Sequence, residues 1–183
     1  SHYVVRQHQD IAPVITRITG GGGLGLRWPL ARRFAGGAVQ RLEPRIQLAG
    51  VMANSDTIPN QDSTQVEFDE GNLFRFNRAP GFDLIETGMR LNIGLAGGID
   101  YPNQTKIGWE IGRIYRTDNA NSFTKTSGLQ GHVSDWLLAA HVQTPLGIEL
   151  VARSLLQNVG LLKKSELRAS WHTSKHQLDA TYV

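Results

Sequence analysis

Four carboxylates lie close together in one short polar segment of this chain: Asp62, Glu67, Asp69 and Glu70. The segment, residues 58–74, reads IPNQDSTQVEFDEGNLF. Two carboxylates can act in acid–base catalysis when a fold holds them about 5–9.5 Å apart across a substrate. A calcium loop needs regularly spaced ligands around a glycine hinge, and this segment lacks that pattern. We expect a long loop that packs through its apolar residues and neither binds a metal nor catalyses a reaction.

The other candidate motifs are incomplete. Residues 19–28, TGGGGLGLRW, lack the lysine and the serine or threonine of a phosphate-binding loop, so the glycines predict a flexible turn between strands. None of the six histidines has the His-Glu-x-x-His spacing of a zinc helix. His132, Ser134 and Asp135 are neighbours in sequence, and on one strand they cannot form a triad. The chain has no cysteine, hence no thiolate ligand. We predict no catalytic residue, no cofactor and no metal.

Composition narrows the class of protein. The 183 residues suffice for one domain. The formal net charge of +3 is spread along the chain, which argues against a nucleic-acid surface, because that would show a basic patch. No apolar run approaches the roughly 18 residues of a membrane-spanning helix, and no signal peptide is visible. The chain begins without methionine and ends within an alternating pattern, so we expect it to be part of a longer protein.

Alternation of apolar and polar residues with a period of two dominates the sequence, and no segment has the pattern of an amphipathic helix. Pro44 predicts a local irregularity in its strand. The fold class is therefore all-β, with antiparallel up-and-down strands. The expected strands are residues 38–52, 86–95, 106–115, 131–143, 147–157, 165–173 and 177–182, preceded by Val4–Ile18 and Leu24–Arg33.

Strand length and loop order favour a membrane barrel. Strands of roughly ten residues suit a tilted crossing of a bilayer and exceed the usual five or six of globular sheets. Long connections at 53–82 and 117–130 alternate with short ones such as TPLG and TSKH. Outer-membrane barrels have long loops outside the cell and short turns in the periplasm. The sequence predicts part of a large transmembrane outer-membrane β-barrel. A soluble carbohydrate-binding β-domain is a weaker alternative.

The alternation also assigns faces in such a barrel. The residues expected to face lipid are Leu91, Ile93, Ile107, Trp109, Ile111, Leu167 and Trp171. The residues expected to face the lumen are Arg90, Asn92, Glu110, Glu166 and Arg168.

Two segments carry a resemblance to a known family. They are LEPRIQL at 42–48 and the run at 58–95, with its elements IPN, DS, NLF, GFD and ETG. Together they resemble the lipopolysaccharide-assembly outer-membrane family LptD, also called OstA. The similarity extends over about residues 24–183 and is most specific in 38–95. Phe-Asp-Leu at 82–84 departs from the Arg or Tyr-Asp-Arg of many members.

The resemblance implies a non-enzymatic translocon that inserts lipopolysaccharide into the outer leaflet of the cell outer membrane. It implies a barrel plugged by an LptE-like lipoprotein and a periplasmic jellyroll that meets the bridge proteins. Residues 1–183 are expected to hold only middle barrel strands, without the jellyroll, the family's cysteines or the terminal strands. The acid-rich segment becomes an extracellular loop, folded into the lumen or against the plug. The alternative is another outer-membrane barrel, a porin or a barrel hydrolase, that uses this loop for selectivity or catalysis.

Overall fold

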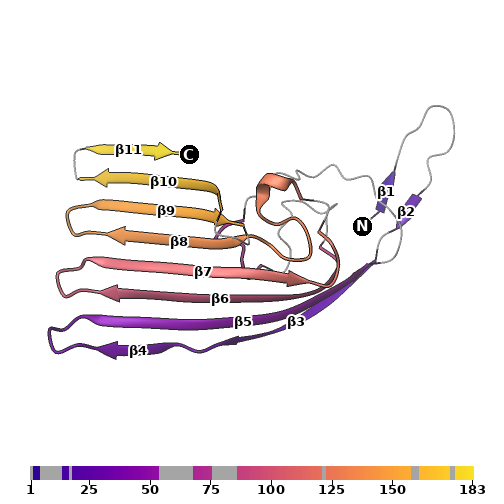
Figure 1. The fold of residues 1–183 in the computed structure, drawn as a ribbon, viewed down its shortest axis with the longest axis horizontal. Coiled ribbons are helices and arrows are strands. Elements are labelled where there is room, and N and C mark those ends of the chain that lie inside the picture. Colours follow the sequence, from indigo (N-terminus) through magenta and orange to yellow (C-terminus); the bar gives the residue numbers. More distant parts are fainter. Residues whose placement is uncertain are drawn as a thin grey trace.

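The structure is a computed structural model that describes residues 2–4, 14–16, 18–53, 68–75, 86–120, 123–157, 161–173 and 176–183. The described part is all-β except for one short 3₁₀ helix (Figure 1). The elements are β1 (His2–Val4), β2 (Val14–Thr16), β3 (Thr19–Arg27), β4 (Leu30–Arg33), β5 (Val39–Ala53), β6 (Gly88–Asp100), β7 (Lys106–Arg116), η1 (Lys125–Ser127), β8 (Trp136–Gln143), β9 (Ile148–Leu156), β10 (Leu162–His172) and β11 (Gln177–Tyr182).

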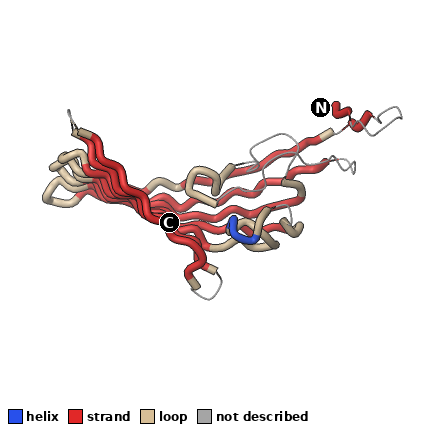
Figure 2. Tube along the Cα trace, turned by 90° about the horizontal axis from the view of Figure 1, so that it is seen from above, coloured by secondary structure: helices blue, strands red, loops and turns tan. Residues whose placement is uncertain are grey.

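Nine of the strands form one antiparallel sheet whose spatial order follows the chain, from β3 and β4 at one edge to β11 at the other. Both β3 and β4 pair with β5, along different parts of it. Seen from above, the sheet is a single twisted layer, as a sheet of L-residues must be (Figure 2). The predicted fold class, antiparallel up-and-down strands, is confirmed. Among the described residues the sheet is open.

The N-terminal third differs from expectation. The glycines of TGGGG lie inside β3, where they pair residue by residue with β5, so the predicted turn was wrong. Backbone hydrogen bonds alone hold this segment in the ladder, because glycine has no side chain to pack. The predicted strand Val4–Ile18 is instead two short strands, β1 and β2, that pair with each other.

The pairing of β5 with β3 and β4 is interrupted near two prolines, Pro29 and Pro44. Pro44 of β5 pairs with Leu95 of β6, while its carbonyl accepts a hydrogen bond from the Trp28 N–H at 3.0 Å. In an antiparallel ladder, the N–H and C=O of one residue point to the same neighbouring strand. The donor that Pro44 lacks is therefore missing on the side of β3 and β4. The ladder breaks there, next to Pro29. The irregularity predicted at Pro44 is present and spares the pairing with β6.

Connections of different length lie at opposite ends of the sheet (Figure 1). The short-turn end, at the left of Figure 1, carries residues 34–38, 101–105, 144–147 and 173–176. The long-loop end carries the two long connections, from β5 to β6 and from β7 to β8, together with the connection from β9 to β10, which is no longer than the short turns. This is the alternation that the sequence predicts.

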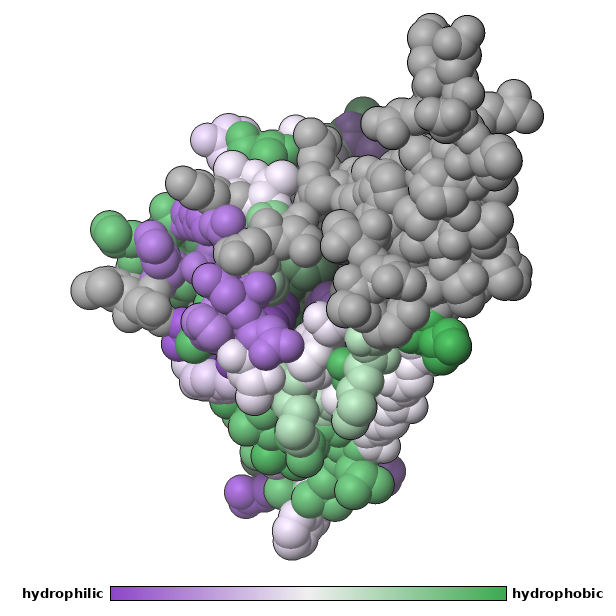
Figure 3. Space-filling model, turned by 90° about the vertical axis from the view of Figure 1, so that its right-hand side faces the viewer, coloured by the Kyte–Doolittle hydropathy of each residue, from purple (hydrophilic) through white to green (hydrophobic). Residues whose placement is uncertain are grey.

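The two sides of the sheet have different chemistry. Directly opposed residues of antiparallel strands project to the same side, and successive residues alternate. One row across the sheet contains Leu42, Gly97, Trp109, Ala140, Ala152, Leu167 and Tyr182. The adjacent row contains Glu43, Ala96, Glu110, Ala139, Arg153 and Glu166. We call the first side the apolar face and the second the polar face. Seen from the long-loop end, where the vertical direction follows the strand order of Figure 1, hydrophobic residues gather in the lower part of the surface and hydrophilic ones above them at its left (Figure 3).

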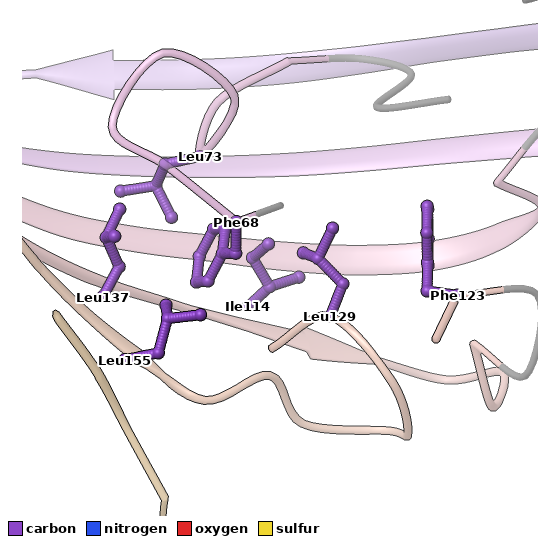
Figure 4. Close-up of a cluster of buried hydrophobic side chains, with 7 residues drawn as sticks. All are labelled: Phe68, Leu73, Ile114, Phe123, Leu129, Leu137 and Leu155. Atoms are coloured by element: carbon purple, nitrogen blue, oxygen red, sulfur yellow. The ribbon is translucent and has the colours of Figure 1, made fainter. Parts of the chain in front are cut away.

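The hydrophobic core lies on the polar face, near the long-loop end. Strands supply three of its seven buried residues, and the two long connections supply the other four (Figure 4). The cluster consists of Ile114, Leu137 and Leu155 from the strands, with Phe68, Leu73, Phe123 and Leu129 from the connections. The core is thus formed between the sheet and its own loops.

Candidate functional site

The strand residues that the sequence assigned to lumen and lipid divide between the two faces. The predicted lumen-facing residues all project from the polar face: Arg90, Asn92, Glu110, Glu166 and Arg168. The predicted lipid-facing residues all project from the apolar face: Leu91, Ile93, Ile107, Trp109, Ile111, Leu167 and Trp171. The structure separates the two sets, and their contact with a lumen and with lipid stays a prediction.

Residues 68–75 sit in a depression of the polar face that two glycines create. Gly94 and Gly112 are directly opposed on β6 and β7. A Cβ atom on Gly112 would lie 2.2 Å from Leu73 Cδ2, and one on Gly94 would lie 2.9 Å from Phe74 Cζ. Only glycine leaves room for these side chains, and Leu73 is completely buried as a result. We call residues 68–75 the inner strap.

The acidic residues of the inner strap are engaged in local structure and an ion pair. Asp69 Oδ1 accepts the Asn72 N–H at 2.8 Å, which closes a turn. Glu70 receives hydrogen bonds from Arg153 of β9, with the Nη2 to Oε1 distance at 2.6 Å and Nε to Oε2 at 2.8 Å. A bidentate arginine–carboxylate pair fixes both position and orientation. Asp62 and Glu67, the other two predicted loop acids, lie outside the described residues.

The Arg153 pair sets the protonation of Glu70. Partial burial alone raises the pKa of this carboxyl, but the hydrogen bonds and the charge of Arg153 outweigh it and hold the pKa below its ordinary value of 4.5. Glu70 is therefore an anion at neutral pH. It serves as an anchor for the strap, whereas a general acid would need a raised pKa.

The second long connection is held by a hydroxyl that the sequence placed among the triad candidates. Ser134 Oγ accepts the Ile114 N–H at 3.0 Å and donates to the Asp135 carbonyl at 2.8 Å. The Asp135 carboxylate pairs with Lys163 Nζ at 2.9 Å. Ser134 and Asp135 are thus parts of a loop attachment.

Beneath the loops the polar face carries a buried polar layer. Asn92 is completely buried and donates from Nδ2 to Gln47 Oε1 at 2.7 Å. Arg90 Nη1 lies 3.5 Å from Glu86 Oε2, and both side chains are buried. Arg116 is directly opposed to Arg90. Opposed like charges repel. The Glu86 carboxylate attracts both guanidinium groups and offsets part of the cost of desolvating them.

Nearer the short-turn end the polar face carries an alternating belt of charges. Arg27 Nε lies 3.1 Å from Glu43 Oε1, and the same carboxylate contacts Arg45. Arg45 Nη1 in turn lies 3.5 Å from Glu110 Oε1. The belt crosses β3, β5 and β7 and is partly solvated. Such a surface suits a water-filled interior and would be costly against hydrocarbon.

One arginine lies on the apolar face. Arg113 lies 5.2 Å from the ring centroid of Trp136 and 5.7 Å from that of Tyr115. Its Nε donates to the Ser134 carbonyl at 2.9 Å. It sits near the long-loop end of β7, where aromatic rings on the same face cover its charge. This explains how the apolar pattern tolerates a cation at that position.

The described residues contain no cluster of three or more metal-ligating side chains. No helix within the described ranges has the length and apolar composition needed to cross a membrane.

Long antiparallel strands in chain order, one apolar face, one polar face and alternating loop lengths define an outer-membrane β-barrel protein. A sequence model of the family described as "LptD: LPS transport system D" matches residues 6–183. The chain belongs to the LptD family, as the resemblance in its sequence predicted. The family transports lipopolysaccharide to the outer membrane, and it is a transport and assembly family, not one known for enzymes. No curated protein matches the chain.

Proposed function

We propose that this chain supplies middle strands of an outer-membrane barrel through which lipopolysaccharide reaches the outer leaflet, and that residues 1–183 belong to that barrel domain alone. Family membership supports the substrate. The observation that carries the rest is the inner strap, packed on the polar face by Leu73 and anchored by Glu70 and Arg153. A polar interior narrowed by its own loop suits a conduit for one large polar molecule.

In this proposal each face has a separate task. The polar face lines the lumen, and the apolar face meets the hydrocarbon of the cell outer membrane. The inner strap narrows the lumen from the side of the long loops, which face the cell exterior. No step of bond chemistry is assigned, because Glu70 is committed to an ion pair and Asp69 to a turn.

The proposal includes two kinds of partner, and family membership supports it. An LptE-like lipoprotein would fill the part of the lumen that the strap leaves open, and periplasmic bridge proteins would deliver lipopolysaccharide through a domain outside residues 1–183. No nucleic acid takes part, since the net charge of +3 is dispersed.

Purification of the intact protein from its own outer membrane tests the proposal. We expect a lipoprotein and lipopolysaccharide to co-purify in fixed ratio with it. A barrel that purifies without either and conducts small solutes or cleaves lipid would be the porin or hydrolase alternative, and it would contradict the proposal.

A further inference from the structure

A pocket of about 310 Å³ opens on the polar face near the short-turn end. The inner strap covers the polar face at the opposed pair Gly94 and Gly112. The pocket lies further along the same two strands, at the opposed pair Gly98 and Gly108. Its wall on β5 is formed by Arg41, Glu43 and Arg45. Small-molecule sites are typically about 300–1,000 Å³ in volume, whereas a protein partner needs roughly 800 Å² of surface on each side. The pocket therefore suits part of a small or extended molecule.

The floor of the pocket is formed by small residues of β6 and β7. Gly98 and Gly108 are directly opposed on β6 and β7, and Ala96 lies beside them. Glycine inside a strand marks places where another group approaches the backbone closely. His141 of β8 lies over Gly108, since a Cβ there would be 2.1 Å from His141 Cε1. The His141 ring covers Gly108, and a ring-shaped ligand can lie beside it, against the small residues Ala96 and Gly98.

The charges around the pocket leave one cation in excess. Arg41 pairs with Asp100, and Glu43 pairs with Arg45. Lys106, at the start of β7, lines the pocket and has no ion-pair partner among the described residues. The Arg41 side chain remains 61% exposed in spite of its ion pair, so its guanidinium can still reach a ligand. Lys106 and Arg41 line the same pocket from β7 and β5, on either side of Asp100 of β6. A lysine ammonium and an arginine fork that reach one ligand favour a phosphate or a carboxylate.

We propose that this pocket binds an anionic sugar, with its acidic group on Lys106 and Arg41 and its ring against Gly98 and His141. The inference deepens the proposed function, because the saccharide of lipopolysaccharide carries such acidic groups. It would place a contact for that saccharide at the short-turn end of the polar face. A free sugar phosphate has the same chemistry, and the experiment distinguishes the two sources.

Calorimetric titration of the intact protein with glucosamine 1-phosphate tests the site. Lys106→Gln and Arg41→Gln should each weaken binding about tenfold, as expected for the loss of a charged hydrogen bond. Ala96→Leu should abolish binding by filling the floor while every charge remains. The matched control is Arg168→Gln, which removes an exposed arginine of the same face outside the pocket and should leave the affinity unchanged.

Inorganic phosphate is the comparison probe. We expect it to bind at least tenfold more weakly than the sugar phosphate, and His141→Ala to reduce only the affinity for the sugar. Equal affinities for both probes would overturn the sugar assignment. An equal loss of affinity in Arg168→Gln would overturn the location. Deacylated lipopolysaccharide that competes with the probe identifies the source as lipopolysaccharide; absence of competition would assign the pocket to a free sugar phosphate and overturn its link to transport.

Delivery of lipopolysaccharide to the cell surface, measured in the same strains, separates this inference from the proposed function. Normal delivery by a protein that binds no probe would overturn the pocket alone. Probe binding with the predicted pattern in a protein whose loss leaves delivery intact would overturn the proposed function, and the pocket would stand as a sugar-phosphate site.

Discussion

Gly94 and Gly112 show how two residues without side chains determine where a loop can lie. Their positions on opposed strands remove side-chain volume from one spot of the polar face, and Leu73 and Phe74 fill that spot. Arg153 then fixes the strap through Glu70. Packing and an ion pair both hold the inner strap. Different residues provide them, so separate substitutions can test each contribution.

Gly112→Ala should detach the strap. The new methyl group would lie 2.2 Å from Leu73 Cδ2 and 3.0 Å from the Ile93 carbonyl. Overpacking of this kind typically costs about 1–3 kcal/mol, measured as the urea dependence of unfolding of the intact protein. Gly25→Ala is the matched control, because its nearest neighbour would be 3.9 Å away, and it should be neutral. Leu73→Ala combined with Gly112→Ala should cost less than the sum of the single changes; strict additivity would mean that the contact is absent.

Acid should loosen the strap. Because the pKa of Glu70 is lowered in the fold, its ion pair stabilises the strap above the ordinary pKa of 4.5, and this contribution is lost as the pH falls through the folded value. A spin label on an Arg75→Cys variant reports the change. Its mobility should rise below pH 4.5 in the parent protein and be high at every pH with Glu70→Gln.

Glu149→Gln, a carboxylate of the same face away from the strap, is the control for that experiment and should keep the parent's pH response. A strap that stays immobile with Glu70→Gln at pH 7 would show that packing alone holds it.

At the scale of elements, period-two alternation predicted the strands well. The expected strand at 106–115 is β7 at Lys106–Arg116, and the expected strand at 177–182 is β11 at Gln177–Tyr182. Side chains carry that signal, so it failed where they are missing: the glycines of TGGGG have low strand preference, yet their backbone completes a ladder with β5. Strand pairing overrode local preference there.

The position at which the inner strap packs on the sheet could not be predicted from the sequence. It depends on the register that opposes Gly94 to Gly112, and on a contact between Glu70 and Arg153 across 83 positions of the chain. The sequence did indicate that Phe68, Leu73 and Phe74 pack the loop, because apolar residues in a polar segment need a surface to cover. Alternation showed which residues share a face, but not what lies above that face.

A pair of neighbouring substitutions in β8 tests the assignment of the faces. Leu138 projects from the apolar face and Ala139 from the polar face, at the same depth in the middle of the sheet. Leu138→Arg should destabilise the intact protein in lipid by ~2–4 kcal/mol, the cost of a cation facing the bilayer centre. Ala139→Arg should cost much less, since the new cation would project from the polar face, between Glu110 and Arg153, and not into hydrocarbon. Equal costs would contradict a barrel, and the reverse order would exchange lumen and lipid.

At the scale of the whole molecule, the alternation of loop lengths predicts orientation. Asn119 is exposed in a long connection, and Pro145 is exposed in a short turn. In otherwise cysteine-free protein, Asn119→Cys should react with an impermeant thiol reagent on intact cells, and Pro145→Cys only after the outer membrane is breached. Reaction of Pro145→Cys alone on intact cells would invert the orientation.

Conditional depletion of the intact protein tests the central claim most directly. Lipopolysaccharide synthesised after depletion is pulse-labelled, and the fraction that reaches the cell surface is measured. The predicted result is a fall in surface lipopolysaccharide as the protein is lost, with newly made molecules retained inside the outer membrane, and recovery on re-expression. Unchanged arrival of labelled lipopolysaccharide at the surface in cells that lack the protein would contradict the claim.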